Sequence, residues 1–459
     1  MALQTVNPST AELVEQFAEW TSEQTADVIN DVAGSWRDWR STTFRQRAGL
    51  MRQAAAVLRR RSDELAGIMA LEMGKPVSEG RAEVEKCAWV CEYFAEHAAR
   101  FLQDTPMQSD ASSAYVACRP LGTILAVMPW NFPFWQVFRF AAPAMMAGNT
   151  AVLKHASNVP RCALTIEDIF HEAGFPKNVF RTLMIGSAQV GHVIENEHIR
   201  AVTLTGSCDA GRKVASKAGA MLKKTLLELG GSDPFIVLND ADMQQAATVG
   251  AKSRCINSGQ SCIAAKRFIV EAGIHDAFVE KLVDAMSRLT VGDPAEEKTQ
   301  VGPLAREDLR NELDTQVRNS VKLGARVLLG GKPLDRRGYF YAPTVLAGVD
   351  AGMPVHDEEV FGPVAAVIRA RDAEHAVAVA NNTRFGLGAS IWTLDTGKGE
   401  DLAAGIESGA VFINGLVKSD PRLPFGGIKE SGYGRELSHY GILEFVNIQT
   451  VWLKQPGSA

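Results

Sequence analysis

The chain has 459 residues, of which 46% are hydrophobic and 22% charged, and its formal net charge is −5. A single hydrophobic core stops growing near roughly 250–300 residues, so we expect two or three domains. The composition is that of an ordinary globular protein, and the lack of a basic surplus argues against nucleic acid or anionic lipid as a partner. Small metabolites are the partners that this charge favours.

The first twenty residues lack the basic start and apolar run of a signal peptide. Later apolar runs are interrupted by proline and are shorter than the ~20 residues that a membrane helix needs. We therefore expect a cytoplasmic protein without a membrane segment. Seven cysteines form an odd, dispersed set without metal-ligand spacing, which favours reduced thiols and argues against both a disulfide framework and a metal site.

Residues 10–100 place apolar and charged side chains at helical spacing, which predicts a set of amphipathic helices. From about residue 119, short apolar runs alternate with turns and helical patterns, as is typical of a parallel sheet with helices on both faces. A second series of strand-like runs begins near residue 234, after the turn "ELGGSDP". The sequence therefore predicts two α/β domains.

Two segments alternate like strands but lie outside both series: "SSAYVACRPLG" at 112–122 and "NIQTVWLKQP" near the end of the chain. They could pair with each other, or with a neighbouring subunit that covers their edges. The sequence leaves both possibilities open.

Two glycine turns follow strand-like runs, "GSAQVG" at 186–191 and "GSCDAG" at 206–211. Backbone N–H groups and the helix dipole at such a junction attract phosphate, which is how a dinucleotide is held. Neither turn has the middle glycine of the usual "GxGxxG" fingerprint. An ordinary strand-to-helix turn is therefore the alternative for each.

Cys262 follows the turn "NSGQS", whose backbone amides could stabilise an oxyanion. A small buried thiol is the alternative for this cysteine taken alone.

In "MPWNFPFW", two prolines hold the backbone on either side of Asn131. In "LLELGGSDP", Glu228 lies in an apolar stretch, where it is either desolvated with a raised pKa, as suits a general base, or turned to water.

The chain resembles the aldehyde dehydrogenase superfamily through "PWNFP", "LTGS", "LELGG", "NSGQSC", "EEVFGPV" and "PFGGIKESGYGRE", which occur in this order across nearly its whole length. The resemblance implies an α/β fold of three parts. These are a Rossmann-like cofactor domain (1–101 and 122–230), an α/β catalytic domain (231–440) and a β-ribbon oligomerisation element (102–121 and 441–459). It also implies a homodimer or homotetramer.

The resemblance implies that Cys262 is the nucleophile, that Asn131 and the Cys262 backbone N–H form the oxyanion hole, and that Glu228 activates water. The reaction would pass through a thiohemiacetal and a thioester on Cys262. A thiol hydrolase would instead need a histidine partner, and no histidine matches that role.

The cofactor-binding residues implied by the resemblance are Trp130, Lys154, Ser157, Thr205, Gly206, Ser207, Gly211, Glu359 and Phe361. Many members have a glutamate where this chain has Ser157, and a carboxylate there would repel a 2′-phosphate. We therefore expect NADP as the preferred cofactor, with NAD possible. Two further departures, Phe140 for a lysine and Asn447 for a glutamate, leave more of the proton transfer to Glu228.

Trp135 and Arg139 are four residues apart on a helix that we expect to begin near Pro133. A guanidinium one turn below a tunnel-lining tryptophan would meet a substrate carboxylate, and the alternative is a salt bridge to a protein carboxylate or a surface position. The resemblance to the succinate-semialdehyde branch rests on Arg139 and on Ser419 in "LVKSDPRLPFGG". The substrate-binding residues that it implies also include Trp135, Phe132 and Phe425.

Some animal members of that branch have another arginine and a second cysteine at the positions of Ile256 and Ala264, so the carboxylate would be held less firmly here and no disulfide switch is expected. The leading hypothesis is NADP-preferring oxidation of succinate semialdehyde to succinate. A broad-specificity or aromatic aldehyde dehydrogenase, a non-enzymatic protein of the same fold and a thiol hydrolase are the alternatives.

Overall fold

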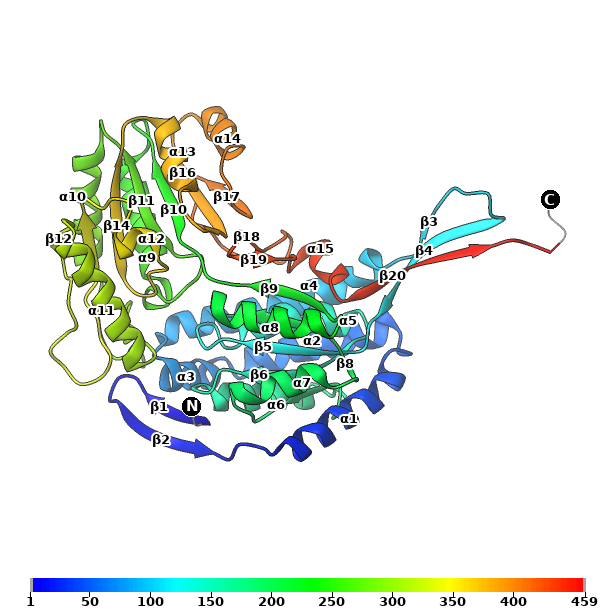
Figure 1. Cartoon of the computed structure of the whole chain (residues 1–459). Coiled ribbons are helices and arrows are strands. Elements are labelled where there is room, and N and C mark those ends of the chain that lie inside the picture. Colours follow the sequence, from blue (N-terminus) through cyan, green and yellow to red (C-terminus); the bar gives the residue numbers. More distant parts are fainter. Residues whose placement is uncertain (1–2, 457–459) are drawn as a thin grey trace.

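The computed structural model describes residues 3–456 and consists of two lobes, each built on a mainly parallel sheet, with a strand ribbon that projects from one lobe (Figure 1). The first lobe contains a six-stranded sheet in the order β19-β9-β8-β5-β6-β7. Its strands are β5 (Thr123–Met128), β6 (Thr150–His155), β7 (Phe180–Thr182), β8 (Ile199–Thr205), β9 (Lys224–Glu228) and β19 (Gly432–Tyr433). All neighbours are parallel except β19 and β9.

The chain order of this sheet reverses at β5, because β6 lies on one side of it and β8 on the other. In open α/β sheets, ligands bind at such a switch point, beyond the carboxyl ends of the strands. Asn131 follows β5 and Gly206 follows β8, so the fold brings two predicted site segments to this point.

Helices cover the first sheet and contain most of the residues predicted to be helical between 10 and 100. They are α1 (Ser22–Trp39), α2 (Phe44–Arg60), α3 (Ser62–Met73), α4 (Val77–Phe101), α5 (Trp135–Met146), α6 (Pro160–Glu172), the 3₁₀ turn η1 (Ser187–Gln189), α7 (Val190–Glu195) and α8 (Cys208–Ala220). The helical prediction is wrong before residue 22. There, β1 (Leu3–Asn7) and β2 (Glu12–Phe17) form an antiparallel hairpin, because "ELVEQF" finds a strand partner in β1.

The second lobe contains a seven-stranded sheet in the order β12-β13-β14-β11-β10-β16-β17, parallel except between β12 and β13. The strands are β10 (Asp233–Val237), β11 (Ala265–Glu271), β12 (Arg326–Leu329), β13 (Thr344–Ala347), β14 (Val364–Ala370), β16 (Gly388–Trp392) and β17 (Ala410–Ile413). Its helices are α9 (Met243–Cys255), α10 (His275–Ser287), α11 (Glu307–Lys322), α12 (Pro354–Asp357), α13 (Ala373–Asn381) and α14 (Thr396–Ala403). Alternate side chains of β10, such as Phe235 and Ile236, enter separate cores on the two faces.

The chain returns from the second lobe to the first between β17 and α15 (Ser438–Leu443). In this segment, β18 (Ile428–Lys429) pairs with β15 (Phe385–Gly386), and β19 then pairs with β9 of the first sheet. Gly432 and Tyr433, predicted to belong to the catalytic domain, thus extend the first sheet. The segment holds the two lobes together beside the end of β9.

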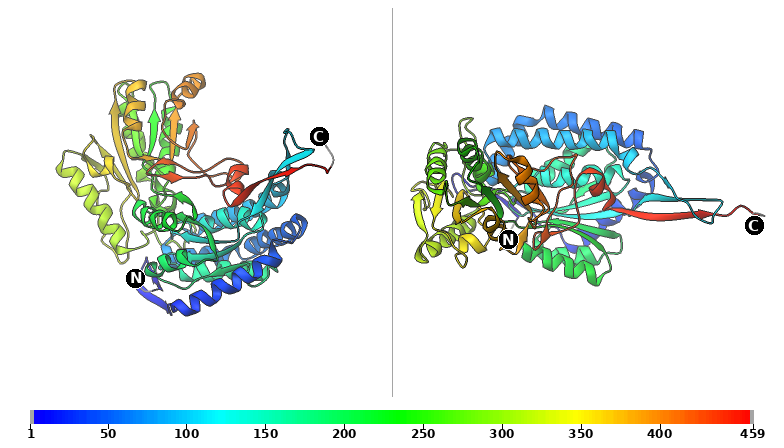
Figure 2. Two further views of the ribbon diagram at one scale, coloured as in Figure 1. Left: turned by 45° about the vertical axis from the view of Figure 1, so that its right-hand side comes forward. Right: turned by 90° about the horizontal axis from the view of Figure 1, so that it is seen from above.

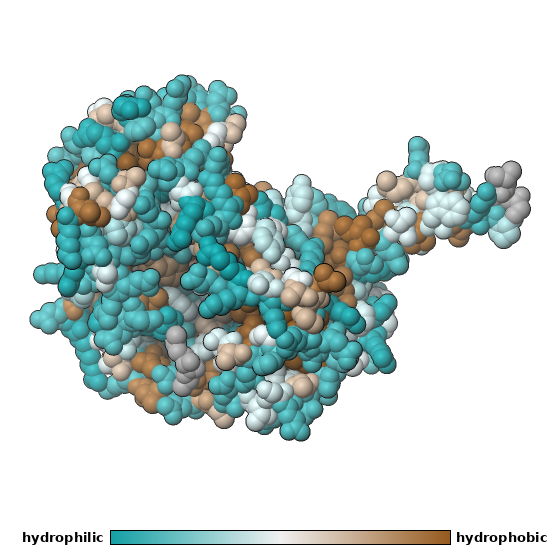
Figure 3. All heavy atoms as spheres, in the orientation of Figure 1, coloured by the Kyte–Doolittle hydropathy of each residue, from teal (hydrophilic) through white to brown (hydrophobic). Residues whose placement is uncertain are grey.

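The ribbon consists of β3 (Thr105–Pro106), β4 (Ser113–Pro120) and β20 (Val446–Leu453), and it extends away from the first lobe (Figure 2). β4 and β20 are antiparallel partners along their whole length, so the pairing within one chain is present. The ribbon exposes Ile448, Trp452 and Leu453, and apolar surface is visible where it leaves the lobe (Figure 3). Within residues 3–456, no helix combines the length and the apolar character that crossing a membrane requires.

Candidate active site

A cleft of about 960 Å³ opens between the two lobes at the carboxyl ends of β5 and β8. Residues of both lobes line it, including Leu309 of α11 and Phe385 of β15. The predicted site residues that line it are Trp130, Asn131, Lys154, Thr205, Gly206, Ser207, Cys262, Glu359 and Phe361. Those that do not are Ser157, Gly211, Glu228, Phe132, Trp135, Arg139, Ser419 and Phe425.

The turn "GSCDAG" forms the N-terminus of α8 at one end of the cleft. The Ser207 hydroxyl caps the helix by accepting the Ala210 N–H at 3.3 Å. Gly211 has a different role, because a Cβ there would lie 2.6 Å from the side chain of Leu229. Its lack of a side chain lets α8 pack closely on the end of β9, while the helix dipole points into the cleft.

The other glycine turn, "GSAQVG", is an ordinary strand-to-helix connection. The Gly186 N–H donates to the Glu19 carboxylate at 2.8 Å, and no residue of this turn is among those that line the cleft within the described chain. Only one of the two turns therefore contributes to the nucleotide end.

Lys154 is buried at the end of β6 and faces the cleft. Burial lowers the pKa of its ammonium group, and the nearby Glu19 opposes that shift. Ser157 lies three residues further, where its carbonyl accepts the Gln4 N–H at 3.1 Å. A cation, a helix N-terminus and a serine instead of a carboxylate fit a phosphorylated nucleotide.

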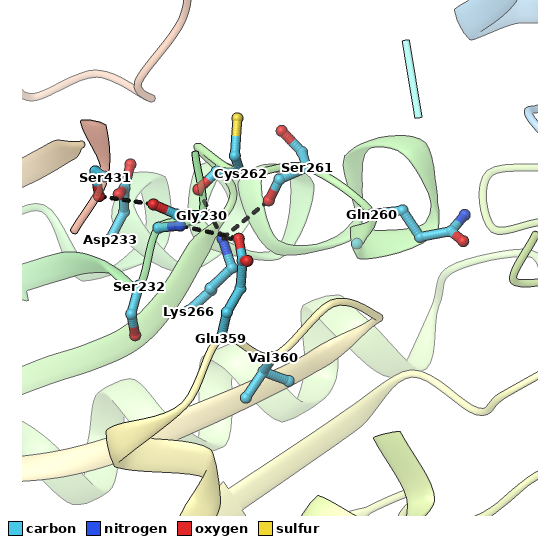
Figure 4. A network of polar contacts seen from close by, with 12 residues as sticks. Gly230, Ser232, Asp233, Gln260, Ser261, Cys262, Lys266, Glu359, Val360 and Ser431 are labelled. Atoms are coloured by element: carbon cyan, nitrogen blue, oxygen red, sulfur yellow. Dashed lines mark hydrogen bonds and ion pairs between the residues drawn. The ribbon is translucent and has the colours of Figure 1, made fainter. Parts of the chain in front are cut away.

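Lys266, which was not among the predicted site residues, connects the loop that contains Cys262 with the loop that contains Glu359 (Figure 4). Its ammonium donates to the Ser261 and Cys262 carbonyls at 2.9 and 2.7 Å and lies 3.7 Å from the Glu359 carboxylate. Glu359 in turn accepts the Gly231 N–H at 2.9 Å. The sequence did contain one indication of the role of Lys266, because it is a lysine near the start of an apolar strand and lies four residues after Cys262.

The turn before Cys262 has left-handed backbone at Asn257, Ser258 and Gly259, with φ of 53°, 56° and 78°. A Cβ at Gly259 would lie 2.3 Å from the backbone of Gly362, so only glycine fits there. The Asn257 side chain donates to the Asn131 carbonyl at 2.7 Å. This strained turn is thereby fixed against the "PWNFP" segment.

The Asn131 side-chain amide donates one hydrogen bond to the Gln260 carbonyl at 3.1 Å. Asn131 is buried, and its amide oxygen has no hydrogen-bond partner among the described residues. The Cys262 side chain points away from the Lys266 network (Figure 4). The structure thus brings the Asn131 amide and the Cys262 thiol to the same cleft, on segments that hydrogen bonds lock together.

Burial raises the pKa of the Cys262 thiol to about 12, although the positive charges of Lys266 and Arg139 oppose the shift. The thiol is therefore protonated at neutral pH in the free protein. Four other cysteines, Cys87, Cys91, Cys162 and Cys255, are fully enclosed. Cys262 is partly exposed, as a nucleophile in a cleft must be.

Glu228 ends β9 and is desolvated, which settles the choice that the sequence left open. Its side chain is 2% exposed, and one carboxyl oxygen has no hydrogen-bond partner among the described residues. Burial, reinforced by the neighbouring Glu436, raises the pKa of this carboxyl well above its usual value. The group does not line the cleft, and it lies against Gly426.

Arg139 has a protein carboxylate as its partner, which is one of the alternatives to a direct substrate contact. Its buried guanidinium forms an ion pair with Glu436 and donates to the Thr205 hydroxyl at 3.3 Å. It also lies 4.7 Å from the centre of the Phe425 ring. No pattern in the sequence predicted that Glu436 would be the carboxylate partner of Arg139.

Trp135 is the first residue of α5, so the helix begins two residues later than Pro133. The Glu83 carboxylate accepts the backbone N–H groups of Phe134 and Trp135, both at 2.9 Å, and so fixes the start of the helix. The Trp135 ring lies 4.3 Å from the Lys86 ammonium, which donates to the Ser419 hydroxyl at 2.7 Å.

Two further residues predicted on the substrate side, Phe132 and Phe425, are aromatic. Phe132 stacks under the ammonium of Lys75, and Phe132, Trp135, Phe425 and Cys262 belong to one hydrophobic cluster. Two departures from the family pattern lie elsewhere. Phe140 packs edge-on against Phe445, and Asn447 is paired with Arg119 in the ribbon.

Comparison with known proteins identifies the family. The family model described as the aldehyde dehydrogenase family matches residues 1–451. A protein of Synechocystis sp. named probable NADP(+) succinate-semialdehyde dehydrogenase is 50% identical over 453 residues, which cover 99% of this chain and 100% of that protein. The Escherichia coli (strain K12) NAD(P)+ succinate semialdehyde dehydrogenase Sad is 48% identical over 447 residues and 97% of each chain.

A solved structure gives the same result. The crystal structure of succinic semialdehyde dehydrogenase from Streptococcus pyogenes, in complex with NADP+ as the cofactor, has a TM-score of 0.97 and 40% sequence identity. The match covers 99% of this chain and 100% of that chain.

Proposed function

The chain belongs to the aldehyde dehydrogenase family, and we propose that it oxidises succinate semialdehyde to succinate with NADP as the preferred cofactor and NAD as a second one. The observation that carries the proposal is the cleft in which the Cys262 thiol and the Asn131 amide meet the residues that fit a nucleotide. The named substrate and cofactor of the relatives support the choice.

The cofactor would be held by residues from both lobes. Ser207 and the α8 N-terminus suit the pyrophosphate, and Lys154 and Ser157 suit the phosphorylated ribose. Glu359 suits the hydroxyls of the second ribose, while Trp130 and Phe361, whose rings lie 5.7 Å apart, flank the nicotinamide end. When bound, the nicotinamide accepts the hydride that leaves the substrate carbon.

Cys262 forms the covalent intermediate. The thiol releases its proton to solvent water, its sulfur bonds to the aldehyde carbon, and the carbonyl oxygen becomes the oxyanion of a thiohemiacetal. One N–H of the Asn131 amide is used by Gln260, and an amide carries two, so the second suits the oxyanion together with the Cys262 backbone N–H. Removal of one such donor typically costs about 3–4 kcal/mol of transition-state stabilisation.

Loss of the hydride leaves a thioester on Cys262, which Glu228 helps to hydrolyse. Glu228 removes a proton from water, the water oxygen bonds to the carbonyl carbon, and the carbon–sulfur bond breaks to give succinate and the free cysteine. A carboxyl whose pKa is raised by burial can accept this proton near neutral pH. Because Glu228 does not line the cleft, its carboxyl must gain access to the water that attacks the thioester for this step.

One observation favours the second candidate, a broad-specificity or aromatic aldehyde dehydrogenase. The residues on the substrate side are largely aromatic, and the Arg139 charge is compensated by Glu436. In the proposed function, Ser419 contacts the substrate carboxylate, and Arg139 adds positive charge without contacting it. The carbon chain of the substrate is enclosed by Phe132, Trp135 and Phe425.

A steady-state assay distinguishes the two candidates. It measures kcat/KM from the absorbance of the reduced cofactor with succinate semialdehyde, butanal and benzaldehyde, each with NADP and with NAD. We expect the highest kcat/KM for succinate semialdehyde with NADP. A higher value for either neutral aldehyde would favour the broad-specificity enzyme. Turnover without any cofactor would support a thiol hydrolase, and absence of turnover with all three aldehydes would indicate a protein without this activity.

We also propose that the protein forms a homodimer or homotetramer through its ribbon and acts in the cytoplasm on a small-molecule aldehyde. The exposed apolar side chains of β20 support association of subunits. All seven cysteines are free, which suits a reducing compartment.

A further inference from the structure

Lys86 is a cation on the substrate side that no predicted role accounts for. It lies on α4 and extends across Trp135 of α5 to Ser419, which belongs to the loop between β17 and β18. Three separate elements therefore meet at its ammonium group. Both Trp135 and Ser419 are residues for which the family resemblance implies substrate contact.

The cations around Lys86 each have a carboxylate of their own. Lys75 pairs with Glu83, Arg139 with Glu436, and Arg422 with Asp420 at 2.7 Å. Within the part of the chain that the structure describes, Lys86 forms no such pair, and its contacts are a hydroxyl group and an aromatic ring.

A partly buried ammonium without a counter-ion is unfavourable, because the protein replaces only part of its lost hydration. Burial, assisted by the charge of Arg139, lowers the pKa of Lys86 to about 8. A bound anion would remove this cost. The site is thus arranged to receive a negative charge from outside the chain.

Lys86 and Cys262 share one charged neighbour. The positive charge of Arg139 acts on both the Cys262 thiol and the Lys86 ammonium. In succinate semialdehyde, two methylene groups separate the aldehyde from the carboxylate.

We propose that the Lys86 ammonium, together with the Ser419 hydroxyl, binds the carboxylate of the aldehyde substrate and thereby selects an aldehyde acid over a neutral aldehyde. The inference rests on the proposed function. It assigns the direct contact to Lys86 because the guanidinium of Arg139 is already paired with Glu436. A cation that only covers the Trp135 ring would not affect this selectivity.

The test compares kcat/KM for succinate semialdehyde and butanal in Lys86→Met, Lys86→Arg and the control Lys177→Met, which changes an exposed lysine that does not line the cleft. Loss of a hydrogen-bonded charge should lower kcat/KM for succinate semialdehyde in Lys86→Met roughly 10- to 100-fold, mainly through KM. The value for butanal and the KM for NADP should change little. Lys86→Arg should keep part of the preference, and the control should match the wild type.

A second measurement is independent of turnover. Succinate should raise the melting temperature of the wild type and of Lys177→Met, but not that of Lys86→Met. If Lys86→Met does not fold, Lys86→Gln replaces it in both experiments.

The outcomes separate the two proposals. A wild type that prefers succinate semialdehyde, with the same preference in Lys86→Met, would overturn the role of Lys86 alone. A wild type that does not prefer succinate semialdehyde over butanal would overturn the proposed function and this inference together.

Discussion

The Arg139 guanidinium on α5 and the Glu436 carboxylate before α15 form an ion pair whose side chains are only 2% and 3% exposed. The pair ties the central helix of the first lobe to the segment that returns from the second lobe. Glu228 lies beside it and is affected by both charges. One buried contact therefore influences both the stability of the lobe interface and the state of the proposed general base.

Breaking this pair from one side should destabilise the protein strongly. Arg139→Met leaves Glu436 buried without a counter-ion and should lower the free energy of unfolding by about 3–5 kcal/mol. The double variant Arg139→Met/Glu436→Leu, which removes both charges, should recover a large part of that loss. Urea unfolding of the two variants measures the difference, and equal destabilisation in both would show that the pair itself contributes little.

Removal of the Asn131 amide should impair the chemical step. We expect Asn131→Ala to lower kcat roughly 100- to 1,000-fold, because the oxyanion loses one donor. The dissociation constant of NADP, measured by fluorescence, should stay close to that of the wild type. A variant that loses cofactor affinity to the same extent would point to a structural role for the bond to Gln260.

Replacement of the Glu228 carboxyl should slow thioester hydrolysis but not thioester formation. Glu228→Gln should give a rapid burst of reduced cofactor, approaching one equivalent per active site, followed by slow turnover. Because burial and Glu436 raise the pKa of Glu228, its basic form is lost as pH falls through that raised value. The wild-type kcat should therefore decline on the acid side, and Glu228→Gln should lack this decline. A variant without the burst would place Glu228 in an earlier step.

The charge of Lys86 should appear in the pH dependence of selectivity. Its pKa of about 8 is influenced by Arg139 on α5, by Cys87 and Glu83 on α4, and by Asp420. The ammonium is charged below that pH and neutral above it, so kcat/KM for succinate semialdehyde should fall relative to butanal as pH rises through about 8. Lys86→Arg should not show this change, because a guanidinium stays charged. A ratio independent of pH would argue against the role of Lys86.

Charged residues on the ribbon should prevent association of subunits. Ile448 and Trp452 are 63% and 49% exposed, and their replacement by glutamate should give a monomer by light scattering. Leu394→Glu is the control, because this side chain is 74% exposed on the body of the protein. An unchanged mass in the ribbon variants would show that the subunits associate through another surface.

The sequence alone determined the features that depend on local pattern. Period-two and period-3.6 hydrophobicity predicted two α/β domains, and the order of the motifs along the chain identified the family by resemblance. Asn131, Cys262 and Glu359 were predicted in this way, and all three line the cleft. The helical pattern failed before residue 22, where pairing with a second strand decided the conformation.

Only the tertiary structure decided which charges meet. Arg139 and Glu436, Lys266 and Glu359, and Lys86 and Ser419 are each far apart in the chain. No local pattern predicts which partner a buried charge will find, because that depends on how the lobes and the returning segment pack. Burial then changes the pKa of each group, and so the chemistry of the site follows from the three-dimensional contacts.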